Sequence, residues 1–385
     1  MDLLQKIFSD SGLMSLTWQN VTMFFIASLL IYLAIAKDYE PLLLLPIGFG
    51  ALVANIPNGM MAAFHDWVPS GHEVVPPLLQ LVYNAGIKTE FLPPVIFLGV
   101  GALTDFRPLL SRPITFVLGG AAQFGVCIAA MGAFYLFGFT PQEAGSIGII
   151  GGADGPTSIY LTAKMAPHLM GAIAVASYSY MSLVPVIQPP VIRLLTTKKE
   201  RAIQMKQAKP VSRTTILLFP IVATLMTALV LPSVAPLIAM LMFGNLIRES
   251  GVTDRLSNTA STHLINTVTI FLALAVGATM EGTNFLKAQT LFILILGCIA
   301  FIFSTAGGVV FAKLINLFLP EGRKINPCIG AAGVSAVPMS ARVVQRFVSE
   351  ETNGKVNPLM AAMGPNVAGV IGTAIAAGVF LALLK

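Results

Sequence analysis

An aspartate interrupts one of the most apolar parts of the chain. Asp154 lies in the segment GGADGPTSIY (residues 151–160), among glycines and a proline, and the hydroxyl residues Thr157 and Ser158 follow it. An ionised carboxylate in an apolar environment is costly, and such residues usually mark ion or proton pathways. A single carboxylate with neutral oxygen ligands suits a hard, monovalent cation. The segment therefore predicts a site for Na⁺ or a proton rather than for a transition metal.

Other polar residues have types that would complete this site. Ser335 and Ser340 lie in GVSAVPMSAR (residues 333–342), where Ser335 is either a packing serine or a ligand. Asn366, in GPNVAGVIG, carries an amide that needs partners in an apolar segment, and we expect it to line the site. Tyr180 is either a functional group or a buried tyrosine with a satisfied hydroxyl. Arg342 either helps to set the membrane topology, with its side chain reaching the cytoplasmic interface, or binds an anion.

Composition defines the surroundings of these residues. Hydrophobic residues make up 56% of the 385 and charged residues 10%, and the mean hydropathy is +0.82. Soluble domains do not have such an apolar composition. The apolar stretches approach the length of membrane-spanning helices and lack the alternation of a membrane β-barrel. The sequence therefore predicts an all-α polytopic membrane protein. We expect spans near residues 21–36, 41–56, 91–103, 114–139, 169–192, 215–231, 235–247, 264–280, 290–317 and 357–384.

Two further segments enter the membrane but contain helix breakers. Residues 144–162 and 326–342 are long and apolar, and both are interrupted by glycine and proline. Such backbone is tolerated at membrane depth only where it is buried in protein or lines a cavity. We expect both to be broken, re-entrant segments that meet near the midplane, as in many secondary transporters. Residues 57–90 are expected to be re-entrant or interfacial, and residues 1–20 to form a retained interfacial helix.

An internal repeat relates the two halves of the chain. VIFLGVGALTDF (residues 95–106) is similar to TIFLALAVGATMEG (residues 269–282), and GADGPTS corresponds to GVSAVPMS, which aligns Asp154 with Ser335. The positive-inside rule gives the second copy the opposite orientation. Sixteen of the 23 Lys and Arg residues then lie in cytoplasmic loops. The sequence thus predicts an N-terminal repeat (1–192), a basic cytoplasmic linker (193–213) and an inverted C-terminal repeat (214–385).

Several other kinds of site and function are disfavoured. The net charge of +6 lies in short connectors and does not indicate nucleic-acid binding. Cys127, Cys298 and Cys328 lack metal-ligand spacing and are expected to pack. The four histidines form no ligand pair and are expected at the interfaces, and no motif for ATP binding appears. From these residues alone the chain is a sodium- or proton-coupled transporter with a midplane site.

The same segments resemble a known family. GALTDFRPLL, GGADGPTSIY, GAAGVSAVPMSARVVQ and GPNVAGVIGTAIAAG occur in this order, and the chain resembles the membrane β subunit of the biotin-dependent, sodium-translocating decarboxylases. That family acts on oxaloacetate, methylmalonyl-CoA or glutaconyl-CoA. The resemblance implies functional roles for the following positions: Asp154, Tyr180, Asn326, Gly330, Ser335, Arg342 and Asn366.

The resemblance also implies a reaction. A partner subunit moves a carboxylate onto biotin of a carrier, and this subunit decarboxylates carboxybiotin while it moves Na⁺ outward. We expect Asp154, Tyr180, Ser335 and Arg342 to act in catalysis, Asn326, Gly330 and Arg342 to contact carboxybiotin, and Asp154, Asn366, Ser335 and Thr157 to bind Na⁺.

The implied setting is a complex in the bacterial inner membrane. Its expected partners are a carboxyltransferase (α) subunit, a biotin carrier, a small single-span γ or δ subunit and further copies of this chain. The alternative is a free-standing, sodium-coupled carrier of a carboxylate, which would use the same midplane ligands.

Overall fold

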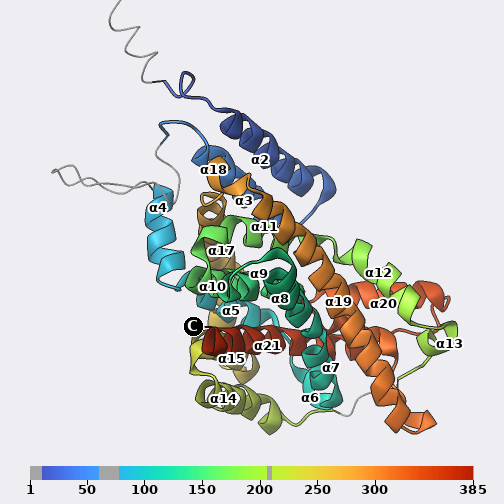
Figure 1. The fold of residues 1–385 in the computed structure, drawn as a ribbon. Helices are drawn as coiled ribbons and strands as arrows, with labels where there is room; N and C mark the ends of the chain where they lie inside the picture. The colour runs from blue at the N-terminus through green and yellow to red at the C-terminus, as the bar shows by residue number, and fades with distance from the viewer. Residues whose placement is uncertain (1–10, 60–77, 206–209, 385) are drawn as a thin grey trace, which may run out of the picture.

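A computed structural model describes residues 11–59, 78–205 and 210–384, and throughout these residues the secondary structure is helical. Six helices are long and apolar enough to cross a membrane, and two bent helix pairs raise the number to as many as eight. This confirms the expected all-α, polytopic architecture. The longest helix, α19, runs diagonally across Figure 1, and α21 crosses behind it near the middle of the molecule.

The chain folds into the following helices. The first half contains α2 (Trp18–Lys37), α3 (Pro41–Ala54), α4 (Leu78–Val82), η1 (Tyr83–Lys88), α5 (Leu92–Leu103), α6 (Arg107–Ser111), α7 (Ile114–Ala122), α8 (Phe124–Phe137), α9 (Pro141–Gly148), η2 (Ile149–Gly152), α10 (Gly155–Met165), η3 (Pro167–Leu169), α11 (Met170–Ser182) and α12 (Val184–Leu195). The linker and the second half contain α13 (Lys198–Arg201), α14 (Arg213–Val230), η4 (Pro232–Val234), α15 (Ala235–Ser250), α16 (Asp254–Asn258), η5 (Thr259–Leu264), α17 (Ile265–Gly277), α18 (Gly282–Phe285), α19 (Ala288–Phe318), η6 (Glu321–Arg323), η7 (Pro327–Gly333), α20 (Met339–Glu351) and α21 (Leu359–Leu383).

One predicted span is sharply bent. The segment expected to cross at residues 169–192 consists of α11 and α12, which are bent by 65° at Leu183. Pro185 lies in the first turn of α12, where its missing amide and its ring prevent the α11 hydrogen-bond ladder from continuing. The α4–η1 unit meets α5 at 67°, and α5 likewise begins with prolines, Pro93 and Pro94.

Both predicted helix breaks are present. In the first segment α9 passes into η2, Ala153 adopts a left-handed conformation (φ 52°), and α10 starts after Asp154. In the second, η7 ends at Gly333, an irregular stretch follows, and α20 starts at Met339. The second segment was expected to end at Arg342, but α20 continues to Glu351. The reason is a continuing apolar stripe, since Val344, Phe347 and Val348 are buried on one face.

Close backbone contacts hold the second broken segment against its neighbours. A Cβ atom on Gly330 in η7 would lie 2.0 Å from the carbonyl oxygen of Gly308 in α19. A Cβ atom on Gly369 in α21 would lie 2.3 Å from the carbonyl oxygen of Gly333. Such small-residue contacts let helices approach closely in membranes. The second broken segment is therefore packed between α19 and α21 without space for added side-chain atoms.

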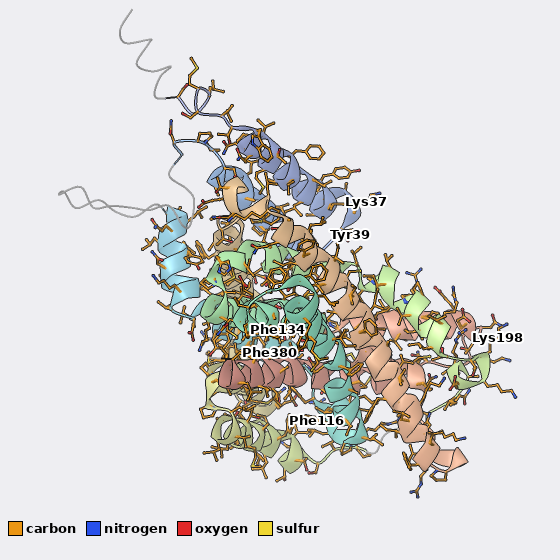
Figure 2. All side chains as sticks on the ribbon, viewed as in Figure 1. Lys37, Tyr39, Phe116, Phe134, Lys198 and Phe380 are labelled. Carbon is orange, nitrogen blue, oxygen red and sulfur yellow. The ribbon has the colours of Figure 1, made fainter. Side chains whose placement is uncertain are left out.

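The outer helices expose apolar side chains, as lipid contact requires. Only 6% of the apolar window of α14 is buried within the protein. Phe116 and Phe134, labelled in Figure 2, lie on the α7–α8 span, and both are exposed. The basic linker has a charged surface instead. Its Lys198, on α13, projects from the edge of the molecule.

Some predictions fall partly on undescribed residues. His65, His72 and most of the segment at residues 57–90 lie outside the described residues, as do the first ten of the N-terminal segment. Of the expected N-terminal helix, residues 12–15 form turns, and Trp18 already begins α2. The repeat boundaries at 192 and 214 and the inverted relation of the halves stay predictions.

Candidate functional site: the junction of the two broken segments

Asp154 caps the helix that follows the first break. Its Oδ1 accepts a hydrogen bond from the amide of Thr157 at 3.2 Å, and Asp154 is only 5% exposed. Aspartate is a preferred N-cap because its side chain satisfies an amide that the first turn leaves free. The positive end of the helix dipole also favours the ionised carboxylate. The sequence therefore folds here so that a buried charge has local compensation.

The second broken segment meets Asp154 directly. The hydroxyl of Ser335 donates to Asp154 Oδ2 at 2.9 Å, although the two residues are 181 positions apart. The amide of Ser335 also donates to the carbonyl oxygen of Gly152 at 2.8 Å. These two bonds confirm that the broken segments lie together, as predicted. Each oxygen of the Asp154 carboxylate thus has a donor, one from each segment.

Asn366 supports the irregular stretch around Ser335 from α21. Its Nδ2 lies within hydrogen-bonding distance of the carbonyl oxygens of Val334 (2.7 Å) and Ala332 (3.1 Å), and at 3.4 Å from that of Ala336. Its Oδ1 is buried and has no hydrogen-bond partner within the described residues. Buried polar atoms are rarely left unpaired without a reason. A free amide oxygen beside Ser335 is thus available as a cation ligand.

Thr157 adds a further oxygen near the carboxylate. Its side chain is fully buried, and Oγ1 also lacks a partner among the residues that the structure describes. With Asp154, Ser335 and Asn366, the junction offers one carboxylate and neutral oxygens from three segments. This ligand set fits a monovalent hard cation such as Na⁺, for which oxygen ligands and a single negative charge suffice.

Tyr180 lies apart from this junction. Its hydroxyl donates to the carbonyl oxygen of Leu294 in α19, and its ring lies against Gly297. Tyr178, which was not among the predicted site residues, is the tyrosine beside Asp154. A Cβ atom on Gly155 would lie 1.9 Å from its ring, and its buried hydroxyl has no partner in the described chain. Residues two apart on a helix point in nearly opposite directions, so only one of the two can face the break.

Asn326 and Gly330 have structural contacts in the second segment. Asn326 is fully buried, accepts from the amide of Cys328, and donates to the linker carbonyls of Arg201 and Ile203. Gly330 contacts the α19 backbone, as described above. Arg342 is exposed on α20, and within the described residues its guanidinium has no side-chain hydrogen bond or ion pair. The structure thus brings four of the predicted residues together at the junction: Asp154, Thr157, Ser335 and Asn366. The other four lie outside the junction: Tyr180, Asn326, Gly330 and Arg342.

A buried arginine joins the linker to α20. Arg201 donates to Glu351 at 2.7 Å and to the carbonyl oxygens of Arg193 and Thr196. Arg193 also contacts Glu351 at 2.8 Å, and these two arginines hold the pKa of the Glu351 carboxyl below its usual value. The linker is therefore attached at both ends of this region, to Asn326 at the start of the second broken segment and to Glu351 at the end of α20.

Gln188 also contacts the second broken segment without having been predicted as a site residue. It is fully buried on α12, and its amide donates to the carbonyl oxygen of Ala331 at 2.9 Å and to the hydroxyl of Ser340 at 2.8 Å. The position of Gln188 before two prolines gave no sequence signal for this contact. It fixes the start of α20 relative to the bent helix pair.

Two broken segments that share a buried carboxylate, within a bundle of membrane-spanning helices, define an ion-translocating membrane protein. Comparisons with known proteins identify which kind. Residues 19–384 match the family described as the Na⁺-transporting oxaloacetate decarboxylase β subunit, and the chain belongs to this family. It is therefore the multi-pass membrane subunit of a bacterial Na⁺-transporting, biotin-dependent decarboxylase complex.

Individual relatives are similar over nearly their whole length. The chain is 56% identical to the methylmalonyl-CoA decarboxylase subunit β of Veillonella parvula, over 99% of this chain and 98% of the relative. It is 55% identical to the glutaconyl-CoA decarboxylase subunit β of Acidaminococcus fermentans, over 99% and 97%. It is 49% identical to the oxaloacetate decarboxylase β chain of Klebsiella pneumoniae, over 99% of both. These matches confirm the resemblance and favour the pump over a free-standing carrier.

Proposed function

We propose that this subunit decarboxylates carboxybiotin and couples the reaction to outward Na⁺ transport through Asp154. The observation that carries the proposal is the sharing of one buried carboxylate by both broken segments, through Thr157 and Ser335. In the reaction, the bond between the ureido nitrogen of biotin and the carboxylate carbon breaks. Carbon dioxide leaves, the nitrogen keeps the electron pair, and it takes up one proton.

Coupling follows from competition at one group. The Asp154 carboxylate binds either Na⁺ or a proton, so that protonation releases Na⁺ and deprotonation allows the next ion to bind. Ser335 or Tyr180 would relay the proton, and the hydrogen bond from Ser335 to Asp154 supports the first of these routes. Thr157 and Asn366 would complete the Na⁺ ligands with their unpaired oxygens. Moving one Na⁺ against 100 mV costs about 2.3 kcal/mol, which sets the minimum that decarboxylation must supply per ion.

Access to the site would alternate by rocking of the inverted repeats. The junction of the two broken segments would move as one body against the remaining helices. On the cytoplasmic side, Arg342 on the exposed face of α20 would meet the arriving carboxylate. Asn326 and Gly330 would shape the same approach, as the family resemblance implies.

The partners follow from the reaction. A carboxyltransferase α subunit, a biotin carrier and a small single-span γ or δ subunit would complete the pump in the bacterial inner membrane, with further copies of this chain. The relatives named above are β subunits of a methylmalonyl-CoA, a glutaconyl-CoA and an oxaloacetate decarboxylase. A partner would select among such substrates, because this subunit meets only carboxybiotin.

The test measures both half-reactions in one preparation. The complex is reconstituted in vesicles, and sodium-22 uptake is recorded together with carbon dioxide release from carboxybiotin. We expect Asp154→Asn to abolish both, because the neutral amide cannot exchange a proton for Na⁺. Asp254→Asn, a change at an exposed aspartate on α16, is the matched control and should leave both rates unchanged. Sodium-dependent turnover in Asp154→Asn would refute the coupling role.

A further inference from the structure

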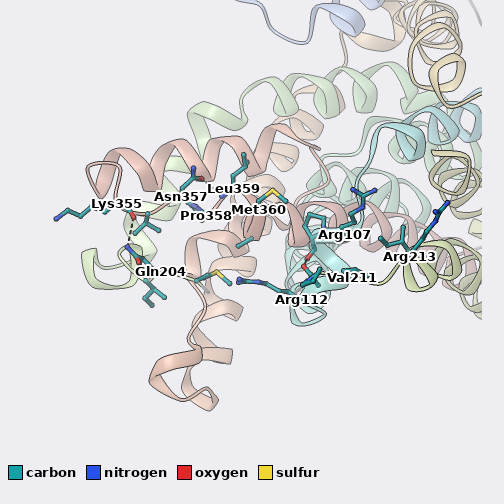
Figure 3. A pocket seen from close by; sticks show the side chains of 18 residues that line it. Arg107, Arg112, Gln204, Val211, Arg213, Lys355, Asn357, Pro358, Leu359 and Met360 are labelled. Carbon is teal, nitrogen blue, oxygen red and sulfur yellow. Dashed lines mark hydrogen bonds between the residues drawn. The ribbon is translucent and has the colours of Figure 1, made fainter. Parts of the chain in front are cut away.

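A large basic cavity lies beside the linker, away from the junction of the broken segments. Its volume is about 990 Å³, and its walls come from α6, the linker, the start of α14 and the start of α21. Four cationic side chains line it, Arg107, Arg112, Arg213 and Lys355, and no Asp or Glu occurs among the described lining residues. In Figure 3, Arg112 lies between the wall with Gln204 and Lys355 and the wall with Arg213. The positive-inside rule places this face in the cytoplasm.

The four cations differ in how far they are neutralised. Arg107 pairs with Glu249 at 2.6 Å, and the guanidinium of Arg213 donates to the backbone carbonyl oxygen of Ser250. Arg112 is half-buried, and neither it nor Lys355 has a side-chain hydrogen bond or ion pair within the described part of the chain. Burial lowers the pKa of the Arg112 guanidinium, because removal from water disfavours its charged form. An anion that entered the cavity would therefore gain most at Arg112.

The position of Arg112 relates the cavity to the ion site. Its carbonyl oxygen accepts hydrogen bonds from the amide and the hydroxyl of Thr115, at 2.9 and 2.7 Å. The same Thr115 side chain lies against Gly364 of α21, where a Cβ atom would be 2.6 Å from its hydroxyl oxygen. Asn366 follows two residues later. Ala361, which lines the cavity, precedes Asn366 by five residues, or about 7.5 Å along the helix axis.

We propose that this cavity receives the biotinyl group of the carrier and that Arg112 binds the carboxylate of carboxybiotin there. The proposal rests on the function proposed above and deepens it by assigning the binding site. The cavity is large enough for a small bicyclic ligand, and a guanidinium binds a carboxylate through two parallel hydrogen bonds. Arg342 does not line the cavity and would act only on the approach. Helix α21, which passes from the cavity to Asn366, then connects substrate binding with the ion site.

The experiment compares Arg112 variants in the reconstituted complex, with free carboxybiotin as the probe. Arg112→Gln removes the charge, and we expect KM for carboxybiotin to rise about tenfold or more while kcat and the half-saturating Na⁺ concentration stay near wild type. Arg112→Lys should recover part of the loss, because it restores the charge but not the paired hydrogen bonds. Lys355→Gln, on the wall that also carries Gln204, should raise KM to a smaller extent.

The matched control is Arg255→Gln, a change at an exposed arginine of α16 that also lies on the predicted cytoplasmic side but outside the cavity. It should leave KM unchanged. An unchanged KM in Arg112→Gln and Lys355→Gln, in protein with wild-type thermal unfolding, would overturn the proposal. So would a KM effect that appears in vesicles containing cardiolipin and disappears in pure phosphatidylcholine, because that would assign the cavity to a lipid headgroup. Coupling in the wild type and its loss in Asp154→Asn are read separately, so the proposed function can stand if this assignment fails.

Discussion

At the scale of single residues, the hydrogen bond between Ser335 and Asp154 has a clear expected effect. The Ser335 hydroxyl stabilises the ionised carboxylate, which is the form that binds Na⁺. A hydrogen bond to a charged group contributes about 1.5–3 kcal/mol. Without it, the proton competes more successfully with Na⁺ for the same oxygens.

We therefore expect Ser335→Ala to raise the Na⁺ concentration for half-maximal decarboxylation by about tenfold to a hundredfold. The shift should grow as the pH falls, since a higher proton concentration favours the competing species. The measurement is a Na⁺ titration of carbon dioxide release at two pH values. Ser146→Ala removes the hydroxyl of another buried serine, which donates to the helix carbonyl oxygen of Gln142, and it should leave the titration unchanged. Equal shifts in both variants would argue against a specific effect at Asp154.

The residues of the site were predictable to different extents. Asp154, Ser335 and Asn366 stand out because polar groups are costly in apolar segments. The choice between Tyr178 and Tyr180 depends on which side of α11 faces the break, and the residues of α11 do not form one distinct apolar face that would show this side in the sequence. Their surroundings therefore become visible only in the fold.

At the scale of elements, the packing of η7 against α19 gives a second prediction. Gly330 is predicted to contact carboxybiotin, and in the structure it lies directly against the backbone of Gly308. Added atoms at such a contact force the backbone apart, which typically costs about 1–3 kcal/mol. Either glycine should then be sensitive to a methyl group, although only one of them lies in the broken segment.

We expect Gly330→Ala and Gly308→Ala to lower the thermal unfolding temperature of the purified subunit by similar amounts. Gly120→Ala, on α7, introduces a methyl group into open space and should keep or slightly raise this temperature. Unfolding is followed in detergent by a thermal-shift measurement. If Gly330→Ala unfolded like wild type but lost carboxybiotin turnover, a binding role for this residue would be favoured over packing.

The extents of the elements were largely predictable, and their directions were not. Apolar stretches and flanking charges locate α2, α14, α19 and α21 within a few residues. The 65° bend between α11 and α12 was missed, because a proline in an apolar run is compatible with a straight, a kinked or a broken span. The length of α20 was missed because its buried stripe extends past the polar residues that resembled an end.

At the scale of the whole molecule, the inverted repeat predicts which loops lie on which side of the membrane. The charge pattern places the linker and the α15–α16 connection inside, and the α17–α19 connection outside. Lys198, Val252 and Thr283 are exposed residues in these three regions. Their side chains are suitable for labelling because none takes part in the junction of the broken segments.

We expect Lys198→Cys and Val252→Cys to react with a membrane-impermeant maleimide only in inside-out vesicles, and Thr283→Cys only in right-side-out cells. The unmodified protein serves as the background, since Cys127, Cys298 and Cys328 are free thiols. Mass spectrometry of the labelled subunit reports the modified position. Labelling of Thr283→Cys from the same side as Val252→Cys would contradict the inverted orientation.

The pairing of Ser335 with Gly152 carries a consequence for how the family can vary. This contact joins main chain to main chain, so every residue except proline at position 335 can make it. Mutation of the side chains at this contact therefore leaves the hydrogen bond that joins the two helix breaks in place. Drift at position 335 would change the chemistry offered to the ion while leaving the architecture of the junction intact, so ion preference can evolve without a new fold.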